Sequence, residues 1–225
     1  MANRKIEFSN NEYYHVYNQT VEKRDLFEDE KDLNRFVESA KLFNTQKSIT
    51  SIYANSFLKK DKKDDTEENR LINFIAYCIN PNHYHFIIEQ LVDDGVPKFM
   101  HKFSTGYTNY FNEKHERRGS LFGGRYKAKH IDSDNYLLHL SAYVNLNNMI
   151  HGIKETNDWN TTRSSWKQYT TNEPLNFKDI KCDTEIVIAQ FKNKNEYERY
   201  AKETAEYIKN NRIKEKEDKY GLTTF

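Results

Sequence analysis

The segment LINFIAYCINPNHYHFIIEQL, residues 71–91, has the pattern of a β-hairpin. Two apolar runs that are typical of buried strands flank Asn-Pro-Asn, which favours a turn. Because side chains alternate along a strand, we expect His83 and His85 on one face of the sheet and Tyr84 on the other. Two imidazoles on one face can hold a divalent metal ion, although such pairs are also common where histidines only pack.

The segments around this hairpin alternate between strand and helix patterns. Strands are predicted at residues 12–20, 71–79, 83–91 and within 119–131, and helices at 27–46, 96–116, 133–152 and 183–211. This order predicts an α+β fold, a ferredoxin-like βαββαβ sandwich with an antiparallel sheet, followed by an extra helix and a helical C-terminal extension. We expect one domain over 1–169 and the extension over 170–225. The charged stretch at about 58–70 is expected to be an exposed loop or insertion.

The composition excludes several classes of protein. The chain has 225 residues, which is enough for one substantial domain and an extension. Its two cysteines, Cys78 and Cys182, are too few and too far apart for a zinc module or a disulfide framework, which favours a reducing compartment. No apolar signal segment opens the chain, and no run approaches the roughly 18 apolar residues of a membrane span. We therefore expect a soluble, cytoplasmic protein without membrane contacts.

Charge is distributed unevenly along the chain. The net charge is only +1, but residues 98–130 contain eight Lys or Arg against two acids. A basic stretch of this kind favours a polyanion such as a nucleic acid, and the alternative is a solvated helix face. Arg125 and Lys127, which alternate on one predicted strand face, are the best candidates for phosphate contacts. Weaker candidates are Lys102, Arg117 and Arg118.

The predicted helix 133–152 carries side chains that complete a metal site. Tyr143 and Asn147 are four residues apart and therefore lie on one helical face. If that face covers the histidine strand, the carbonyl oxygen of Asn147 is a candidate third ligand and the Tyr143 hydroxyl lies beside the metal. A mixed nitrogen and oxygen site suits Mg²⁺ or Mn²⁺ next to a phosphate better than a closed zinc site does.

A tyrosine beside a metal-bound phosphate indicates nucleophilic catalysis. A phenol has a pKa of about 10 and is a weak nucleophile at neutral pH, so the metal must draw charge from the phosphate. Attack would give a covalent phosphotyrosine and would conserve the phosphodiester bond energy for rejoining. Tyr136 lies on a similar helical face and is the main rival, with helix packing as its alternative role. His15, His139 and His151 are interpreted as structural or surface residues.

His-Tyr-His fits the signature of the HUH nucleases, and the chain resembles the single-tyrosine transposases, including the REP-associated tyrosine transposases. The resemblance covers roughly residues 12–169, with a weaker similarity near the C-terminus. The segments that carry it are EYYHVYNQTVEKRDLFEDEKDLNRF, YCINPNHYHFII, KFSTGYTNYFNEKHERRGSLFGGRYKAKHI, YLLHLSAYVNLNNMIHGI and DWNTTRSSWKQY.

This resemblance implies that His83, His85 and Asn147 bind the metal and that Tyr143 becomes joined to a 5′ phosphate of single-stranded DNA. It also implies a free 3′ hydroxyl on the other product and recognition of a DNA hairpin near the cut. The chain departs from the family pattern where Asn148 replaces a usual proline. With no proline there, we expect the helix to run on further. Asn145 likewise stands where histidine is frequent.

The sequence therefore predicts an HUH endonuclease or transposase that uses Mg²⁺ or Mn²⁺ on single-stranded or hairpin DNA, in the nucleoid of a prokaryotic cytoplasm. A homodimer stays open, because some relatives exchange the tyrosine helix between subunits while the REP-associated branch is monomeric. Three alternatives also stay open. They are a domesticated or inactive DNA-binding relative, a metal phosphohydrolase that uses water, and an RNA- or protein-binding module whose histidines are structural.

Overall fold

The computed structural model of the chain describes residues 6–47, 69–153 and 162–219. The predicted charged loop at 58–70 lies outside the described residues as far as position 68. No helix in the described ranges is long and apolar enough to cross a membrane.

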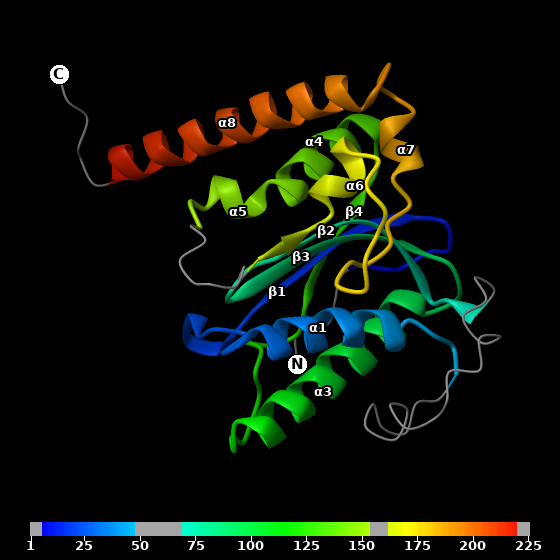
Figure 1. Cartoon of the computed structure of the whole chain (residues 1–225), viewed down its shortest axis with the longest axis vertical. Coiled ribbons are helices and arrows are strands. Elements are labelled where there is room, and N and C mark those ends of the chain that lie inside the picture. Colours follow the sequence, from blue (N-terminus) through cyan, green and yellow to red (C-terminus); the bar gives the residue numbers. More distant parts are fainter. Residues whose placement is uncertain (1–5, 48–68, 154–161, 220–225) are drawn as a thin grey trace.

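A five-stranded antiparallel sheet forms the centre of the molecule (Figure 1). Its strand order is β4-β1-β3-β2-β5, and the first four of these strands have the order of a ferredoxin-like fold. The strands are β1 (Tyr13–Gln19), β2 (Ile72–Ile79), β3 (His83–Gln90), β4 (Lys127–Ile131) and β5 (Arg163–Ser164). The predicted antiparallel α+β fold is therefore confirmed.

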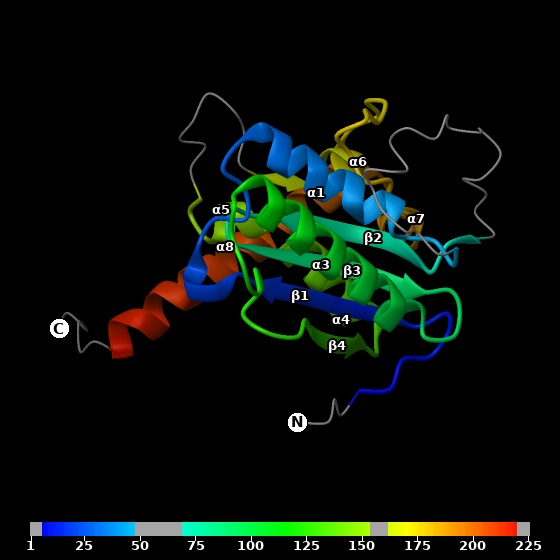
Figure 2. The same cartoon turned by 90° about the horizontal axis from the view of Figure 1, so that it is seen from below.

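Helices cover both faces of this sheet. On one face, α1 (Glu30–Leu42) packs beside α3 (Gly95–Lys114), and Figure 2 looks onto this side. The other face is covered by α4 (Asp134–Asn145), over which the long α8 (Lys194–Lys219) lies (Figure 1). Short elements complete the described chain: η1 (Val21–Lys23), α5 (Asn147–Ile150), α6 (Trp166–Thr170) and α7 (Glu185–Ile188).

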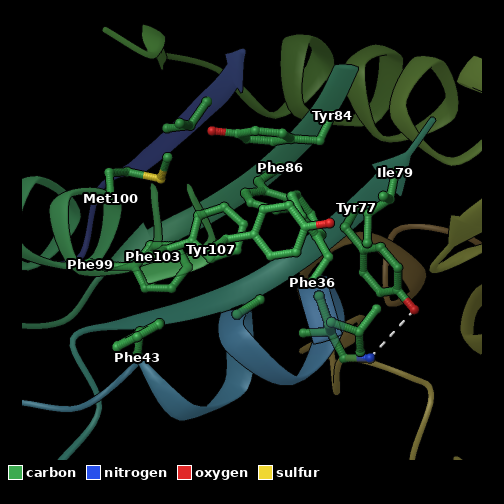
Figure 3. Close-up of a cluster of buried hydrophobic side chains, with 14 of the residues drawn as sticks. Phe36, Phe43, Tyr77, Ile79, Tyr84, Phe86, Phe99, Met100, Phe103 and Tyr107 are labelled. Atoms are coloured by element: carbon green, nitrogen blue, oxygen red, sulfur yellow. Dashed lines mark hydrogen bonds between the residues drawn. The ribbon is translucent and has the colours of Figure 1, made fainter. Parts of the chain in front are cut away.

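An aromatic core fills the space between the sheet and the α1–α3 layer (Figure 3). Tyr84 and Phe86 of β3 point into it, where Phe36 of α1 meets Phe103 of α3 with ring centroids 4.9 Å apart. Gly106, in the middle of α3, lies directly against the ring of Phe43. A side chain at position 106 would collide with that ring, since its Cβ would come within 2.2 Å of it. This close approach explains a glycine that helix propensity alone would disfavour.

The alternation predicted for β3 fixes the position of its histidines. Because Tyr84 and Phe86 enter the aromatic core, His85 and Ile87 face the α4 side of the sheet. The Asn-Pro-Asn turn closes as expected, with the amide of Asn80 donating to the carbonyl of His83 at 2.8 Å.

Two predicted helices are each divided in the structure. The helix expected over 133–152 without interruption breaks at Leu146, whose φ of −111° and ψ of 21° leave the helical range. Both neighbouring asparagines use their side chains in buried hydrogen bonds, Asn145 to Tyr197 of α8 and Asn147 to Asn80 at the sheet. These bonds hold the two asparagines to different layers on either side of Leu146, and the expectation of one uninterrupted helix was wrong. The helix expected over 183–211 is likewise two helices, α7 and α8.

Candidate metal and nucleophile site

His83 and His85 project from the start of β3 toward α4 and α5, with ring centroids 5.4 Å apart. His85 is only 7% exposed, and burial holds its pKa well below the usual range. Burial also lowers the pKa of His83. Both rings are therefore neutral at physiological pH, and a neutral imidazole keeps one nitrogen lone pair available for a metal.

Asn147, the first residue of α5, turns its side-chain oxygen toward His83. Its Oδ1 lies 3.1 Å from His83 Nε2 and accepts a 2.8 Å hydrogen bond from Nδ2 of Asn80. On the other side of the ring, His83 Nδ1 lies 2.7 Å from Oδ1 of Asn82. Because that oxygen is an acceptor, the ring proton belongs on Nδ1, which leaves the lone pair of Nε2 directed toward Asn147.

This donor set fits a small divalent cation. The 3.1 Å between His83 Nε2 and Asn147 Oδ1 matches the roughly 3 Å that separates adjacent ligands around an octahedral ion bound at about 2.1 Å. Among the described residues, no group of three or more His, Cys, Asp or Glu side chains is arranged to hold a metal. If a metal binds here, the side-chain oxygen of Asn147 is the candidate third ligand, and a mixed set of imidazole nitrogens and an amide oxygen suits Mg²⁺ or Mn²⁺ better than a structural zinc.

Tyr143 reaches the same place from the last turn of α4. Its ring meets that of His85 edge to face, with centroids 5.5 Å apart and an interplanar angle of 82°. The Tyr143 hydroxyl accepts a 3.1 Å hydrogen bond from Nη2 of Arg212. Tyr136, the rival on the same helix, instead lies under Lys129, whose Nζ is 4.4 Å from the ring centroid. Of the two tyrosines, Tyr143 is therefore the one whose ring packs against the paired histidines.

His83, His85 and Tyr143 line a cavity of about 360 Å³ whose wall also carries cationic side chains. Lys23, Lys127 and Arg212 contribute cations to its wall, and the described lining residues include no Asp or Glu. Three cations without an acid around one cavity attract an anion such as a phosphodiester. Lys23 belongs to η1, where Glu22 and Lys23 both have positive φ values of 54° and 57°. This backbone conformation is unusual for residues other than glycine and is often found at functional sites.

The other basic candidates lie away from the cavity lining. Arg125 is exposed two positions before Lys127 on the same segment. On the α3 side of the sheet, Nζ of Lys102 donates to the carbonyls of Thr45 and Lys47. Arg117 donates to Asn112 and to the carbonyl of Ser120, and Arg118 beside it is exposed.

The structure brings three further residues to the site, which are Arg212 and two histidines, His15 and His151, that were interpreted from the sequence as structural or surface residues. His15 of β1 lies 2.9 Å from His85, between Nε2 and Nδ1, and burial lowers its pKa to about 4. His151 places its ring 5.0 Å from that of His83, and its Nε2 lies 3.0 Å from Nη1 of Arg212. His139 is exposed. The register that sets Tyr17 opposite His85 also sets His15 beside it, and no pattern in a single sequence shows that register.

Comparisons with known proteins identify the family and the fold. The family model described as Transposase IS200 like matches residues 9–147. A solved structure of a REP-associated tyrosine transposase bound to a REP hairpin matches with 13% sequence identity and a TM-score of 0.51, over 82% of this chain and 93% of that chain. At this identity the match shows a shared fold. No curated protein sequence matches the chain.

Proposed function

Because the chain belongs to the family of IS200-like transposases, we propose that it cleaves and rejoins single-stranded DNA with Tyr143 as the nucleophile. His83, His85 and Asn147 would hold the divalent metal ion, Mg²⁺ or Mn²⁺. The observation that carries the proposal is that Tyr143 packs against His85 while Asn147 faces His83. Tyr143 and both histidines line one cavity that also carries three cations.

The chemistry follows from the atoms that meet in this cavity. The Tyr143 oxygen attacks the scissile phosphorus and loses its proton, and the bond from phosphorus to the 3′ oxygen breaks. The product is a 5′-phosphotyrosine, and the departing 3′ oxygen takes up a proton to become a hydroxyl. Attack of a 3′ hydroxyl on the phosphotyrosine reverses the step and completes strand transfer. A bound divalent ion supplies stabilisation of the negative charge on the phosphate oxygens.

The cationic lining supports a nucleic-acid substrate. Lys127 and Lys23 line the cavity, so these side chains can neutralise backbone phosphates, and the exposed Arg125 precedes Lys127 by two positions. Lys102, Arg117 and Arg118 are not in the lining of this cavity. The solved transposase of the same fold is bound to a REP hairpin, which supports a DNA hairpin as the structured part of the substrate. Tyr143 and His85 meet within one chain, so the proposal needs no exchange of helices in a homodimer.

A covalent adduct tests this proposal directly. The purified protein is incubated with Mn²⁺ and a single-stranded hairpin oligonucleotide labelled at its 3′ end, and the products are separated under denaturing conditions. We expect a labelled protein band, because the tyrosine retains the 5′ phosphate of the labelled fragment. The band should disappear in Tyr143→Phe and in His83→Ala and persist in Tyr136→Phe, which removes the rival hydroxyl.

The alternatives give different results in the same assay. DNA cleavage that survives in Tyr143→Phe and is lost in His83→Ala would identify a phosphohydrolase that uses water. Hairpin binding without any adduct in the unaltered protein would identify a relative that only binds DNA. If calorimetry also shows no metal binding, the histidines are structural.

A further inference from the structure

Helix α8 brings a cation to the nucleophile from far along the chain. The helix lies over α4 (Figure 1), and its buried residues Tyr197, Ala201 and Ala205 anchor it there. Arg212, one to two turns beyond this anchor, reaches the cavity. Residue 212 lies well outside the segment 9–147 that matches the family, so its role does not follow from family membership.

The guanidinium of Arg212 is fixed by two hydrogen bonds. Its Nη2 donates to the Tyr143 hydroxyl at 3.1 Å, and its Nη1 lies 3.0 Å from Nε2 of His151, which accepts. The guanidinium carbon is 5.5 Å from the centroid of the Tyr143 ring. One planar group therefore contacts both the reacting oxygen and a histidine beside His83.

We propose that Arg212 is a catalytic residue, supplied by α8, that stabilises negative charge on the Tyr143 oxygen and on the phosphate during cleavage and rejoining. This inference rests on the function proposed above. When Tyr143 attacks, its proton leaves and the oxygen bonds to phosphorus. When a 3′ hydroxyl attacks the phosphotyrosine, the same oxygen departs with the electron pair of the bond.

In both directions charge develops on an atom that Arg212 already contacts. A charged donor binds an anionic oxygen more strongly than a neutral hydroxyl, so the contact is strongest where it lowers the barrier. The planar fork of an arginine also matches the geometry of a phosphate. A phosphate oxygen that enters the cavity can take the place of His151 as the second acceptor of the guanidinium.

The test compares two arginines on the same helix. Arg212→Gln removes the proposed group, and Arg199→Gln removes an arginine with a 71% exposed side chain elsewhere on α8. The rate of adduct formation is measured in a single turnover with Mn²⁺ and the 3′-labelled hairpin oligonucleotide. The rate of rejoining is measured by adding an excess of a strand with a free 3′ hydroxyl. Melting temperatures and oligonucleotide affinity are measured for each variant.

We expect Arg212→Gln to slow both reactions on the order of 100-fold, as loss of one transition-state donor does elsewhere. Arg212→Lys should recover part of the rate, added guanidinium should accelerate Arg212→Gln, and Arg199→Gln should react like the unaltered protein. Equal rates in Arg212→Gln and Arg199→Gln would overturn the inference. So would a faster Arg212→Gln, which would mean that the contact restrains the nucleophile.

The proposed function can fail separately from this inference. An unaltered protein that forms no adduct, or an adduct that survives in Tyr143→Phe, contradicts the function itself. An adduct that depends on Tyr143 but not on Arg212 contradicts only the role of α8. If Arg212→Gln lowers the melting temperature, Arg212→Lys, which keeps the charge, decides between a folding defect and a chemical one.

Discussion

At the scale of single residues, the proposed metal site depends on the orientation of one amide, that of Asn147. Asn147 can present either its oxygen or its nitrogen to His83. The oxygen faces His83 while Nδ2 of Asn147 is buried without a hydrogen-bond partner in the described structure. Asn80 explains this arrangement, since its fully buried Nδ2 lies 2.8 Å from Asn147 Oδ1 and 3.0 Å from His83 Nε2. A flipped Asn147 would set two N–H donors against each other.

Asn80 should therefore control metal affinity without being a ligand. We expect Asn80→Leu, which has a similar volume and no amide, to weaken Mn²⁺ binding by about 10- to 100-fold, as loss of a ligand-orienting group does in other metal sites. Titration calorimetry measures the affinity directly. Asn73→Leu, on the strand that precedes Asn80 and bonded to Glu89, is the matched control and should bind Mn²⁺ normally. Unchanged affinity in Asn80→Leu would show that another group orients Asn147.

Sequence reasoning could select His83, His85, Tyr143 and Asn147 because their spacing reports local geometry. A two-residue step on a strand and a four-residue step on a helix each imply a shared face. His15, His151 and Arg212 reach the site through strand pairing and helix packing. These contacts join residues that are 61 to 70 positions apart, and no local period encodes them.

At the scale of elements, α8 is attached to α4 through a buried polar network. The Tyr197 hydroxyl accepts from Nδ2 of Asn145 at 2.8 Å and lies 3.2 Å from the hydroxyl of Ser141. Asn145 in turn accepts from Ser165 at 2.6 Å, which links the network to the residue that follows β5. The asparagine that replaces the frequent histidine of the family pattern thus connects three parts of the α4 layer.

Removal of one hydroxyl from this network should loosen α8. We expect Tyr197→Phe to lower the free energy of unfolding by about 1–3 kcal/mol, because the N–H of Asn145 would be left buried without its acceptor. Urea denaturation followed by circular dichroism measures the change. Tyr207→Phe removes the same atom from a 66% exposed tyrosine on the same helix and should leave stability within about 0.5 kcal/mol of the unaltered protein. Equal stabilities of the two variants would contradict the structural role of the network.

The strands β1, β2 and β3 were predictable almost to the residue, whereas β5 and the division of two helices were not. β1 and β3 match the predicted 12–20 and 83–91 closely, because alternation and the Asn-Pro-Asn turn are local signals. The break at Leu146 depends on partners of Asn145 and Asn147 in two different layers. The apolar periodicity of residues 133–152 gives no information about those partners. The division at residue 170 into a domain and an extension stays a prediction.

At the scale of the whole molecule, the net charge is only +1, yet cationic side chains are concentrated around the cavity. Lys23, Lys127 and Arg212 meet at the cavity, whereas acids pair with cations on other surfaces, as Glu30 does with Lys178 at 2.5 Å. Overall charge therefore says little about DNA binding. The field near the cavity governs the approach of a phosphate backbone.

DNA affinity should accordingly depend steeply on salt. We expect the logarithm of the affinity for single-stranded DNA to fall linearly with the logarithm of salt concentration. The magnitude of this slope should become smaller by about 0.7 for each phosphate contact removed. Lys23→Gln and Lys127→Gln should each reduce the slope by that amount. Lys178→Gln, whose partner is Glu30, should leave it unchanged. Fluorescence anisotropy at several salt concentrations measures the slopes, and equal slopes for all three variants would exclude the cavity as the path of the strand.

The placement of Arg212 has a consequence for biosynthesis. The nucleophile and the guanidinium are separated by 69 positions. A ribosome adds about 5–20 residues per second, so the arginine is made roughly 3–14 s after the tyrosine. If Arg212 has the role inferred for it, a nascent polypeptide contains the nucleophile Tyr143 several seconds before it contains the arginine that makes cleavage efficient. Efficient DNA cleavage would then begin only after α8 has been synthesised and packed on α4.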